Sequence, residues 1–298
     1  MGAANVIPGV SGGTIAFVTG IYNPLIDSLK AFDLKAVNLL FQGKFKHLFE
    51  HINVSFLFVL FLGVGVGIVS FGKALKWAVE FNQHQYEIFV WAFFFGLILA
   101  SVFSVGKTIK QWSLSTVLSA LIGVVIAVSL VFIGQAHEND ATLYLILCGA
   151  IAMASMLLPG LSGSFVLMLM GNYYLIMLEA IPNTNLRVIL SVVVGAIVGF
   201  VILSRVISFL LSKYENVTIS TLTGFILGSL VTIWPWKTVE RTVLIGSSGK
   251  EKEVITGFSN WYMPNFESHN MMLILTILAG VALVLLVEFL GNKFSSTK

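Results

Sequence analysis

Charged residues are scarce in this chain of 298 residues. Lysine, arginine, aspartate and glutamate together make up 10% of it, whereas hydrophobic residues make up 57%. A typical soluble domain carries about 25% charged residues, so this composition excludes the soluble globular class. Cysteine is nearly absent, and the single Cys148 excludes an intrachain disulfide. The N-terminal stretch lacks the charged segment of a cleavable signal peptide, so we expect none.

Long apolar runs dominate the rest of the chain. Each has a length close to the roughly 20 residues that cross a bilayer as a helix, and the runs are 54–72, 87–106, 114–134, 188–211, 218–234 and 271–290. Because lipid offers no hydrogen-bonding partners, their backbone is predicted to be helical. The chain is therefore predicted to be an all-α polytopic membrane protein, with a single transmembrane domain over residues 1–298. The formal net charge of +3 reflects lysines in loops and does not indicate nucleic-acid binding.

A Pro-Gly-x-Ser-Gly motif occurs twice, 151 residues apart. Six of the fifteen aligned positions are identical, and these are the pairs Pro8/Pro159, Gly9/Gly160, Ser11/Ser162, Gly12/Gly163, Gly20/Gly171 and Tyr22/Tyr173. A helix-breaking motif that recurs at half the chain length, inside apolar sequence, is typical of internally duplicated transporters with broken membrane helices.

The duplication extends beyond the motif. Glycines and cations follow in the same order, as the pairs Gly63/Gly195, Gly67/Gly199, Lys73/Arg205 and Gly96/Gly228 at an offset of 132, and then Gly123/Gly280 and Gly134/Gly291 at an offset of 157. The offset changes because a segment near 31–53, which we expect to be a loop, is longer than its counterpart at 179–187. These matches predict two repeats, over about residues 1–134 and about residues 141–291.

The orientation of the repeats depends on whether each motif turns back within the membrane. Pro-Gly-x-Ser-Gly is a poor helix interior, which favours a re-entrant hairpin at each motif. Three crossings follow each hairpin, so the second hairpin would enter from the opposite face and the repeats would be inverted. If the motif crosses fully as one helix, the repeats are parallel. The face with more basic residues, nine against seven, is the cytoplasmic candidate.

The two hairpins are not equally complete in the sequence. An apolar limb over 141–158 precedes the second motif, whereas only seven residues precede Pro8. We therefore expect the natural chain to have further residues upstream of Met1.

The motif has the chemistry of an anion site. A helix that begins at glycine exposes its first backbone N–H groups, which favour phosphate. We expect two half-helices that meet near the membrane midplane, begun by Ser11, Gly12, Gly13 and Thr14 and by Ser162, Gly163 and Ser164. The alternative is that the glycines only permit close helix packing. Two matched copies, each with Pro, Gly and Ser, favour binding.

Charged residues near the apolar runs are further candidates. Lys73 and Arg205 would suit an anionic head group, unless they extend to the nearer interface. Asp27 and Glu179 follow the two motif prolines at 19 and 20 residues and could carry coupling protons; the alternative is capping at the membrane surface. The segment with His47 does not have the HExxH spacing, so no metal site is predicted.

The segments Gly2–Ala16, GAANVIPGVSGGTIA, and Leu157–Ser164, LLPGLSGS, resemble the polyprenyl-phosphate transporter family. The resemblance covers nearly the whole chain. It implies a flippase of the bacterial inner membrane that returns undecaprenyl phosphate, the lipid carrier of cell-wall precursors, to the cytoplasmic leaflet. Asn5 lies in the first matched segment and joins the residues expected to bind the phosphate.

Two other functions are open on the residues alone. A secondary transporter of a small soluble anion or cation would use the same repeats with a closed aqueous path instead of a lateral opening. A membrane enzyme of lipid phosphate metabolism is disfavoured, because the chain lacks a clustered acidic metal site and a His-based phosphatase constellation. We therefore expect neither enzymatic activity nor a cofactor.

Overall fold

Long apolar helices dominate the described part of the chain. The computed structural model describes residues 1–5, 11–81, 87–181, 183–245, 251–264 and 268–295. Among these residues, six helices are long and apolar enough to cross a bilayer: α6 Val54–Phe81, α7 Glu87–Gly106, α8 Leu114–Phe132, α11 Leu186–Lys213, α12 Glu215–Ile233 and α13 Ser268–Ser295. The six predicted apolar runs are therefore confirmed as helices, and the chain is a mostly helical polytopic membrane protein.

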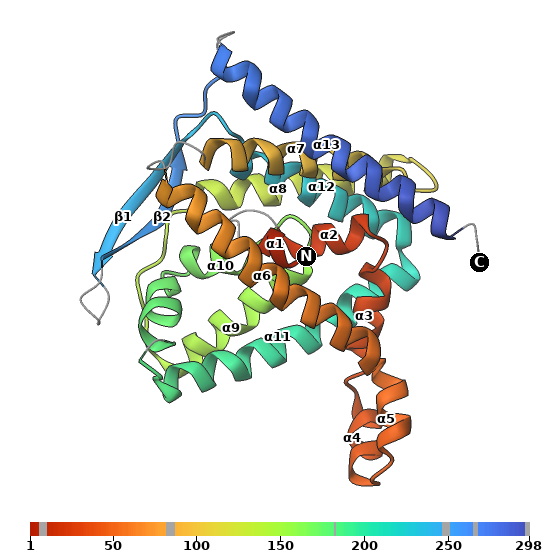
Figure 1. Ribbon diagram of the computed structural model, residues 1–298. Helices are drawn as coiled ribbons and strands as arrows, with labels where there is room; N and C mark the ends of the chain where they lie inside the picture. The colour runs from red at the N-terminus through yellow and green to blue at the C-terminus, as the bar shows by residue number, and fades with distance from the viewer. Residues whose placement is uncertain (6–10, 82–86, 182, 246–250, 265–267, 296–298) are drawn as a thin grey trace.

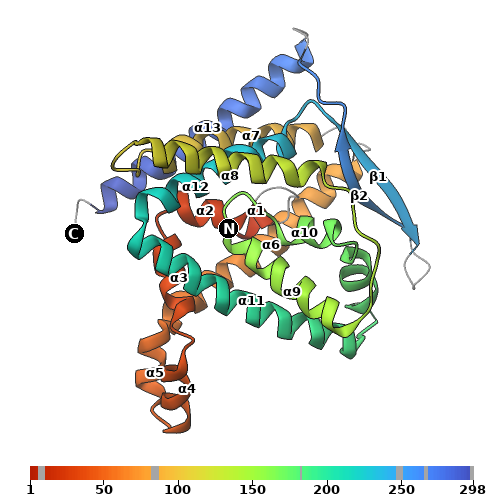
Figure 2. The same ribbon diagram turned by 180° about the vertical axis from the view of Figure 1, so that it is seen from behind.

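Shorter helices connect the long ones and fill the space between them. They are α1 Gly2–Asn5, α2 Gly12–Val18, α3 Tyr22–Lys30, α4 Leu34–Phe41, α5 Phe45–Ile52, α9 Thr142–Leu157, α10 Gly163–Leu169 and the π-helix η1 Tyr174–Ala180. In Figures 1 and 2, α7, α8, α12 and α13 form one group of helices, α9 and α11 pack on each other in a second group, and α6 lies on the opposite side of the molecule from α9. Helix α1 packs on α6, and α2 contacts both α7 and α9.

The two motif segments have nearly the same backbone. Ser11 precedes α2 with φ −106° and ψ 133°, and Ser162 precedes α10 with φ −110° and ψ 132°. Each helix is 7 residues long and is followed by a left-handed glycine, Gly20 at φ 71° and Gly171 at φ 72°. Glycine adopts this region without the clash that a Cβ atom causes. The half-helices expected after the two motifs are therefore present.

The long helices are matched in length across the two halves of the chain. Both α6 and α11 are 28 residues long, and their bounds differ by the offset of 132 that relates the glycines. The apolar windows Leu114–Phe132 and Met271–Phe289 are each 19 residues long and differ by the offset of 157. The correspondence between halves thus extends from single residues to whole elements.

Helices of one half pack along helices of the other. The close pairs α8 with α12 and α7 with α13 both cross between halves. A Cβ atom on Gly123 would collide with the carbonyl of Thr221, and one on Gly280 with that of Phe93. These glycines therefore bring the backbones together, as small residues do in membranes.

Helix directions follow from contacts at the two ends. Phe95, in the first half of α7, makes an edge-to-face contact with Trp234 just after α12, with ring centroids 5.2 Å apart. Lys110, just after α7, pairs with Glu215 at the start of α12 at 2.6 Å. Helices α7 and α12 are therefore antiparallel.

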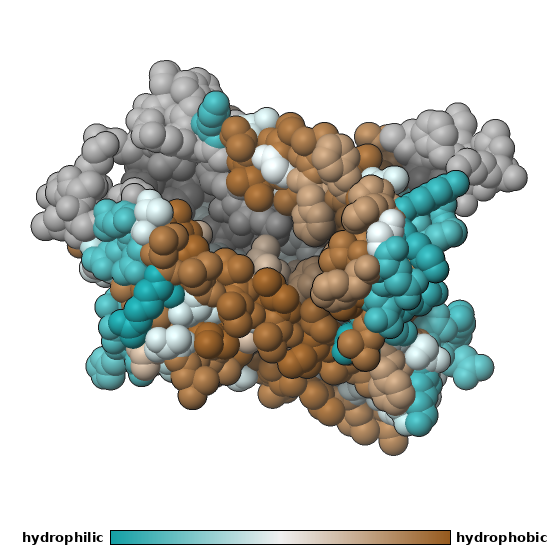
Figure 3. All heavy atoms as spheres, turned by 90° about the horizontal axis from the view of Figure 1, so that it is seen from below, coloured by the Kyte–Doolittle hydropathy of each residue, from teal (hydrophilic) through white to brown (hydrophobic). Residues whose placement is uncertain are grey.

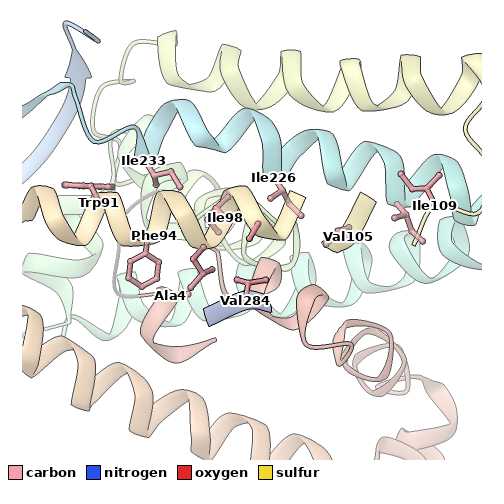
Figure 4. Packing of buried hydrophobic residues seen from close by; sticks show 12 residues of the cluster. Ala4, Trp91, Phe94, Ile98, Val105, Ile109, Ile226, Ile233 and Val284 are labelled. Atoms are coloured by element: carbon pink, nitrogen blue, oxygen red, sulfur yellow. The ribbon is translucent and has the colours of Figure 1, made fainter. Parts of the chain in front are cut away.

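A buried cluster joins the halves around α7. Figure 4 shows Phe94 and Ile98 of α7 with Ile226 of α12, Ala4 of α1 and Val284 of α13. Four elements that are distant in the sequence thus share one apolar core.

The segment near 31–53 is helical, so its expectation as a loop was wrong. Asp33 caps α4 by accepting a hydrogen bond from the Ala36 N–H at 2.9 Å, and its Oδ1 lies 3.2 Å from His51 Nε2 near the end of α5. These contacts pair α4 with α5 as a helical hairpin, which projects from the body in Figures 1 and 2.

A further element outside the long helices lies between α12 and α13. Strands β1 Thr238–Ile245 and β2 Glu251–Ser259 pair there in antiparallel fashion. Beside them Lys237 is buried: its Nζ lies 3.9 Å from the Trp91 ring centroid and donates to the Trp234 carbonyl at 2.8 Å. The aromatic residues thus stabilise a buried cation.

Candidate functional site

The two motifs contact each other directly. Gly160 N–H donates a hydrogen bond to Thr14 Oγ1 at 2.9 Å, and Ser11 Oγ donates to the carbonyl of Leu158 at 3.2 Å. The expectation that the motif segments approach each other is confirmed for these residues. Pro8, Gly9 and Val10 lie outside the described part of the structure.

The broken helix α9 explains why these contacts form. The last carbonyls of a helix have no partner within the helix, and α9 ends at Leu157. The Tyr22 hydroxyl donates to the carbonyl of Leu157 at 3.1 Å, and Ser11 Oγ donates to the next carbonyl, that of Leu158. The first half of the chain therefore satisfies backbone groups that the break in the second half exposes.

The motif glycines pack against α9. A Cβ atom on Gly13 would lie 3.2 Å from the carbonyl oxygens of both Met156 and Leu157. One on Gly163 would lie 2.9 Å from the carbonyl oxygen of Ala152 and from Met156 Cγ. Both glycines thus have a packing role, which was the alternative interpretation, independently of any ligand.

The hydroxyl groups of the two motifs are used differently. Ser11 Oγ accepts from Gly13 N–H at 3.1 Å in addition to its bond to Leu158, so it caps its own helix. Ser162 makes no such cap, and its Oγ lies 2.8 Å from Ser164 Oγ. Ser162 is buried and Ser164 is half-buried. The second motif therefore carries a pair of hydroxyls, whereas Ser11 and Thr14 of the first motif join the two segments.

The predicted cations lie on the surface of the two matched helices. Lys73 and Arg205 are exposed, and each lies eight residues before the end of its helix. That spacing corresponds to about 12 Å along a helix axis. Over this distance a long Lys or Arg side chain can extend toward the membrane–water interface. Within the described residues, no hydrogen bond or ion pair joins either side chain to the motif residues.

The remaining candidates are spread over three elements. Asp27 is exposed on α3, and Glu179 is half-buried in η1. Asn5 ends α1, and its side chain lies outside the described part of the structure. Glu179 lies near Glu138, whose pKa is raised by burial and by the charges of Glu179 and Asp140. The two proposed coupling carboxylates therefore lie on separate elements, α3 and η1.

An apolar groove adjoins the motif contact. It has a volume of about 910 Å³ and is bounded by the α4–α5 hairpin on one side, by α9 and α11 on the other, and by Phe61 of α6. Figure 3 shows a molecular face that is hydrophobic and hollowed in its middle and hydrophilic toward its two ends.

Comparison with known proteins identifies the family. A family profile described as undecaprenyl phosphate translocase-like matches residues 1–252. The chain belongs to this family. It is 36% identical over 297 residues to the Polyprenyl-phosphate transporter of Vibrio cholerae, an alignment that covers 98% of this chain and 94% of that protein. It is 29% identical over 255 residues to the Polyprenyl-phosphate transporter of Staphylococcus aureus, covering 79% and 83%. No solved structure matches the chain at a significant level.

This member of the translocase-like family has site features that sequence analysis missed. Tyr22 was noted only as a repeated residue, yet its hydroxyl joins the two halves; its identity with Tyr173 was the available signal. Met156 was not singled out, although it contacts the positions of both motif glycines. No sequence pattern marks Met156, because its role depends on the packing of three distant segments.

Proposed function

We propose that this chain translocates undecaprenyl phosphate or a related polyprenyl phosphate across the bacterial cytoplasmic membrane, for recycling of the cell-wall lipid carrier. The observation that carries this proposal is the direct contact of the two motif segments in a member of the translocase-like family. The names of the relatives from Vibrio cholerae and Staphylococcus aureus support the choice of substrate. The chain acts as a transporter without enzymatic activity.

The architecture of the transporter is two inverted repeats, over about residues 1–134 and about residues 141–291. Three observations support it: α6 and α11 have equal lengths, α7 is antiparallel to its counterpart α12, and α8 and α13 each pack on the opposite half. Helices α9 and α10 have 16 and 7 residues, fewer than the roughly 20 that cross a bilayer. They pack against each other, which supports a re-entrant hairpin.

The phosphate binds at the contact between the motifs, near the membrane midplane. Ser162 and Ser164 offer hydroxyls, and Ser11, Thr14 and Asn5 take part once the segments move apart. Gly12, Gly13 and Gly163 keep the surroundings free of side-chain bulk. A phosphate in a region of low dielectric constant is costly unless its charge is paired. Lys73 and Arg205 supply that charge as the head group enters or leaves, and Asp27 or Glu179 carries a coupling proton.

Leaflet-specific detection of undecaprenyl phosphate tests this function. Cells depleted of their own translocase should accumulate the lipid in the outer leaflet, and expression of this chain should return it to the cytoplasmic leaflet. A Ser162→Ala/Ser164→Ala double variant should lower that return by about tenfold, which corresponds to about 1.4 kcal/mol. Ser129→Ala is the matched control, because that hydroxyl bonds locally to Ile126 at 2.8 Å on an exposed helix face. An unchanged leaflet distribution at full expression would contradict the proposal.

A further inference from the structure

The apolar groove beside the motif contact is large enough for part of a lipid chain. Its volume of about 910 Å³ lies toward the upper end of small-molecule pockets, which hold about 300–1,000 Å³. Val37 and Leu40 of α4 face Val193 and Ile197 of α11 across it. Asp33 is the one ionisable residue among those that line it. The lining therefore suits an apolar chain.

The inner wall of the groove is also the wall of the candidate phosphate site. Met156 lines the groove. Its Cγ lies 2.9 Å from a Cβ position on Gly163, and its carbonyl oxygen lies 3.2 Å from a Cβ position on Gly13. The groove is thus separated from the two motif glycines by one residue, Met156.

We infer that the groove holds the first isoprene units of the polyprenyl chain while the phosphate lies at the motif contact. This inference rests on the proposed function and adds a site for the tail. The remainder of the chain extends into lipid past the α4–α5 hairpin, which forms the outer wall of the groove.

The lining favours an isoprenoid over an ordinary phospholipid. Met153 and Met156 have flexible, polarisable side chains that adapt to a methyl-branched chain. Ala36 and Ala196 leave space between the larger side chains.

Photolabelling of the purified full chain in vesicles tests the occupant. The probe is farnesyl phosphate with a diazirine at the end distant from the phosphate. Labels should fall on 153–156 and 193–201, and undecaprenyl phosphate should reduce them at least tenfold, whereas undecaprenol and phosphatidylglycerol should not. Equal labelling of the exposed face of α8, or equal competition by phosphatidylglycerol, would show that the groove is filled by bulk lipid and would overturn the inference.

Groove-filling variants test the role of the site in transport. Val193→Trp and Ile197→Trp place bulk in the groove at side chains that are 45% and 59% exposed, so the fold should tolerate them. Each should lower undecaprenyl-phosphate translocation about tenfold. Val125→Trp on α8 is the control, at a side chain that is 65% exposed and does not line this groove.

The two proposals fail in different ways. If the wild-type chain does not translocate undecaprenyl phosphate, the proposed function is wrong. If the wild type translocates it, both groove variants do so at the wild-type rate, and no label falls in the groove, then only the tail site is wrong.

Discussion

Thr14 and Gly160, which are 146 residues apart, are joined by a buried hydrogen bond from the Gly160 N–H to Thr14 Oγ1 at 2.9 Å. A backbone group of one motif thus depends on a side chain of the other. Any movement that separates the motif segments to admit a phosphate must break this bond. Its strength therefore affects both the stability of the chain and its transport rate.

Removal of the Thr14 hydroxyl should destabilise the protein. Thr14→Val keeps the shape of the side chain but leaves the Gly160 N–H buried without a partner, at a cost of about 1–3 kcal/mol. Thermal unfolding in detergent should show a lower Tm. Thr19→Val is the control, because the Thr19 hydroxyl bonds to Ile15 in its own helix at 2.7 Å and is exposed. Equal Tm values for the two variants would contradict the role of Thr14.

Two left-handed glycines allow backbone strain to be separated from close packing. Gly20→Ala imposes only the strain of the left-handed region, about 1–2 kcal/mol, because no atom lies within 4 Å of its Cβ position. Gly160→Ala adds a contact of 2.6 Å with the carbonyl oxygen of Phe225 on α12. Gly160→Ala should therefore lower Tm and transport more than Gly20→Ala. A similar loss of Tm and transport in both variants would show that α12 moves away from the added methyl group at little cost in free energy.

The exposed cations test how the head group enters. Arg205→Gln and Lys73→Gln should each reduce undecaprenyl-phosphate transport about tenfold, because a full charge offsets dehydration of the phosphate better than backbone dipoles do. Arg187→Gln should have little effect on transport. Arg187 lies at the start of α11 and already contacts Asp140, with 3.9 Å between its Nη1 and Oδ2 of the carboxylate. The measurement is rescue of translocase-depleted cells at matched protein abundance. Full rescue by both variants would identify Lys73 and Arg205 as interface anchors.

Asp33 should make the stability of the α4–α5 hairpin depend on pH. Its pKa is lowered, chiefly by the Ala36 N–H and then by His51. A carboxyl group with a lowered folded-state pKa stabilises the fold above its ordinary pKa, which is about 3.9, and loses that effect as pH falls through the lowered value. Asp33→Ala should remove this dependence and cost about 1 kcal/mol through the lost helix cap. Thermal unfolding of the two proteins between neutral and acidic pH measures the difference, and an unchanged profile would contradict it.

The spanning helices and the half-helices could be predicted from the sequence because their causes are local. An apolar run of about 20 residues has to satisfy its own backbone groups in lipid, so its helical state follows from composition alone. Gly20 and Gly171 end the half-helices through the conformational freedom of a single residue. The matching offsets also predicted which helices correspond, and α6 and α11 have the expected relation.

The segments outside the apolar runs were harder to predict. Helices α4 and α5 depend on the cap at Asp33 and its contact with His51, which lies 18 residues away. The β-hairpin between α12 and α13 lies against Trp91 of α7, whose ring makes an edge-to-face contact with Phe258 at a centroid distance of 5.9 Å. The sequence predicted the segment near 31–53 as a loop, because hydropathy does not register contacts of this kind.

The sequence by itself determined that this chain is a polytopic membrane protein with two Pro-Gly-x-Ser-Gly breaks. It also supplied the motif residues of the candidate site, although not the roles of Tyr22 and Met156. Only the tertiary structure decided how those residues are used: Ser11 and Thr14 join the two motifs, Gly13 and Gly163 pack on α9, and Met156 connects the site to an apolar groove. The reason is physical, because an unpaired carbonyl at the end of α9 can be satisfied by any nearby donor. The donor that reaches it is fixed by the packing of helices far apart in the chain.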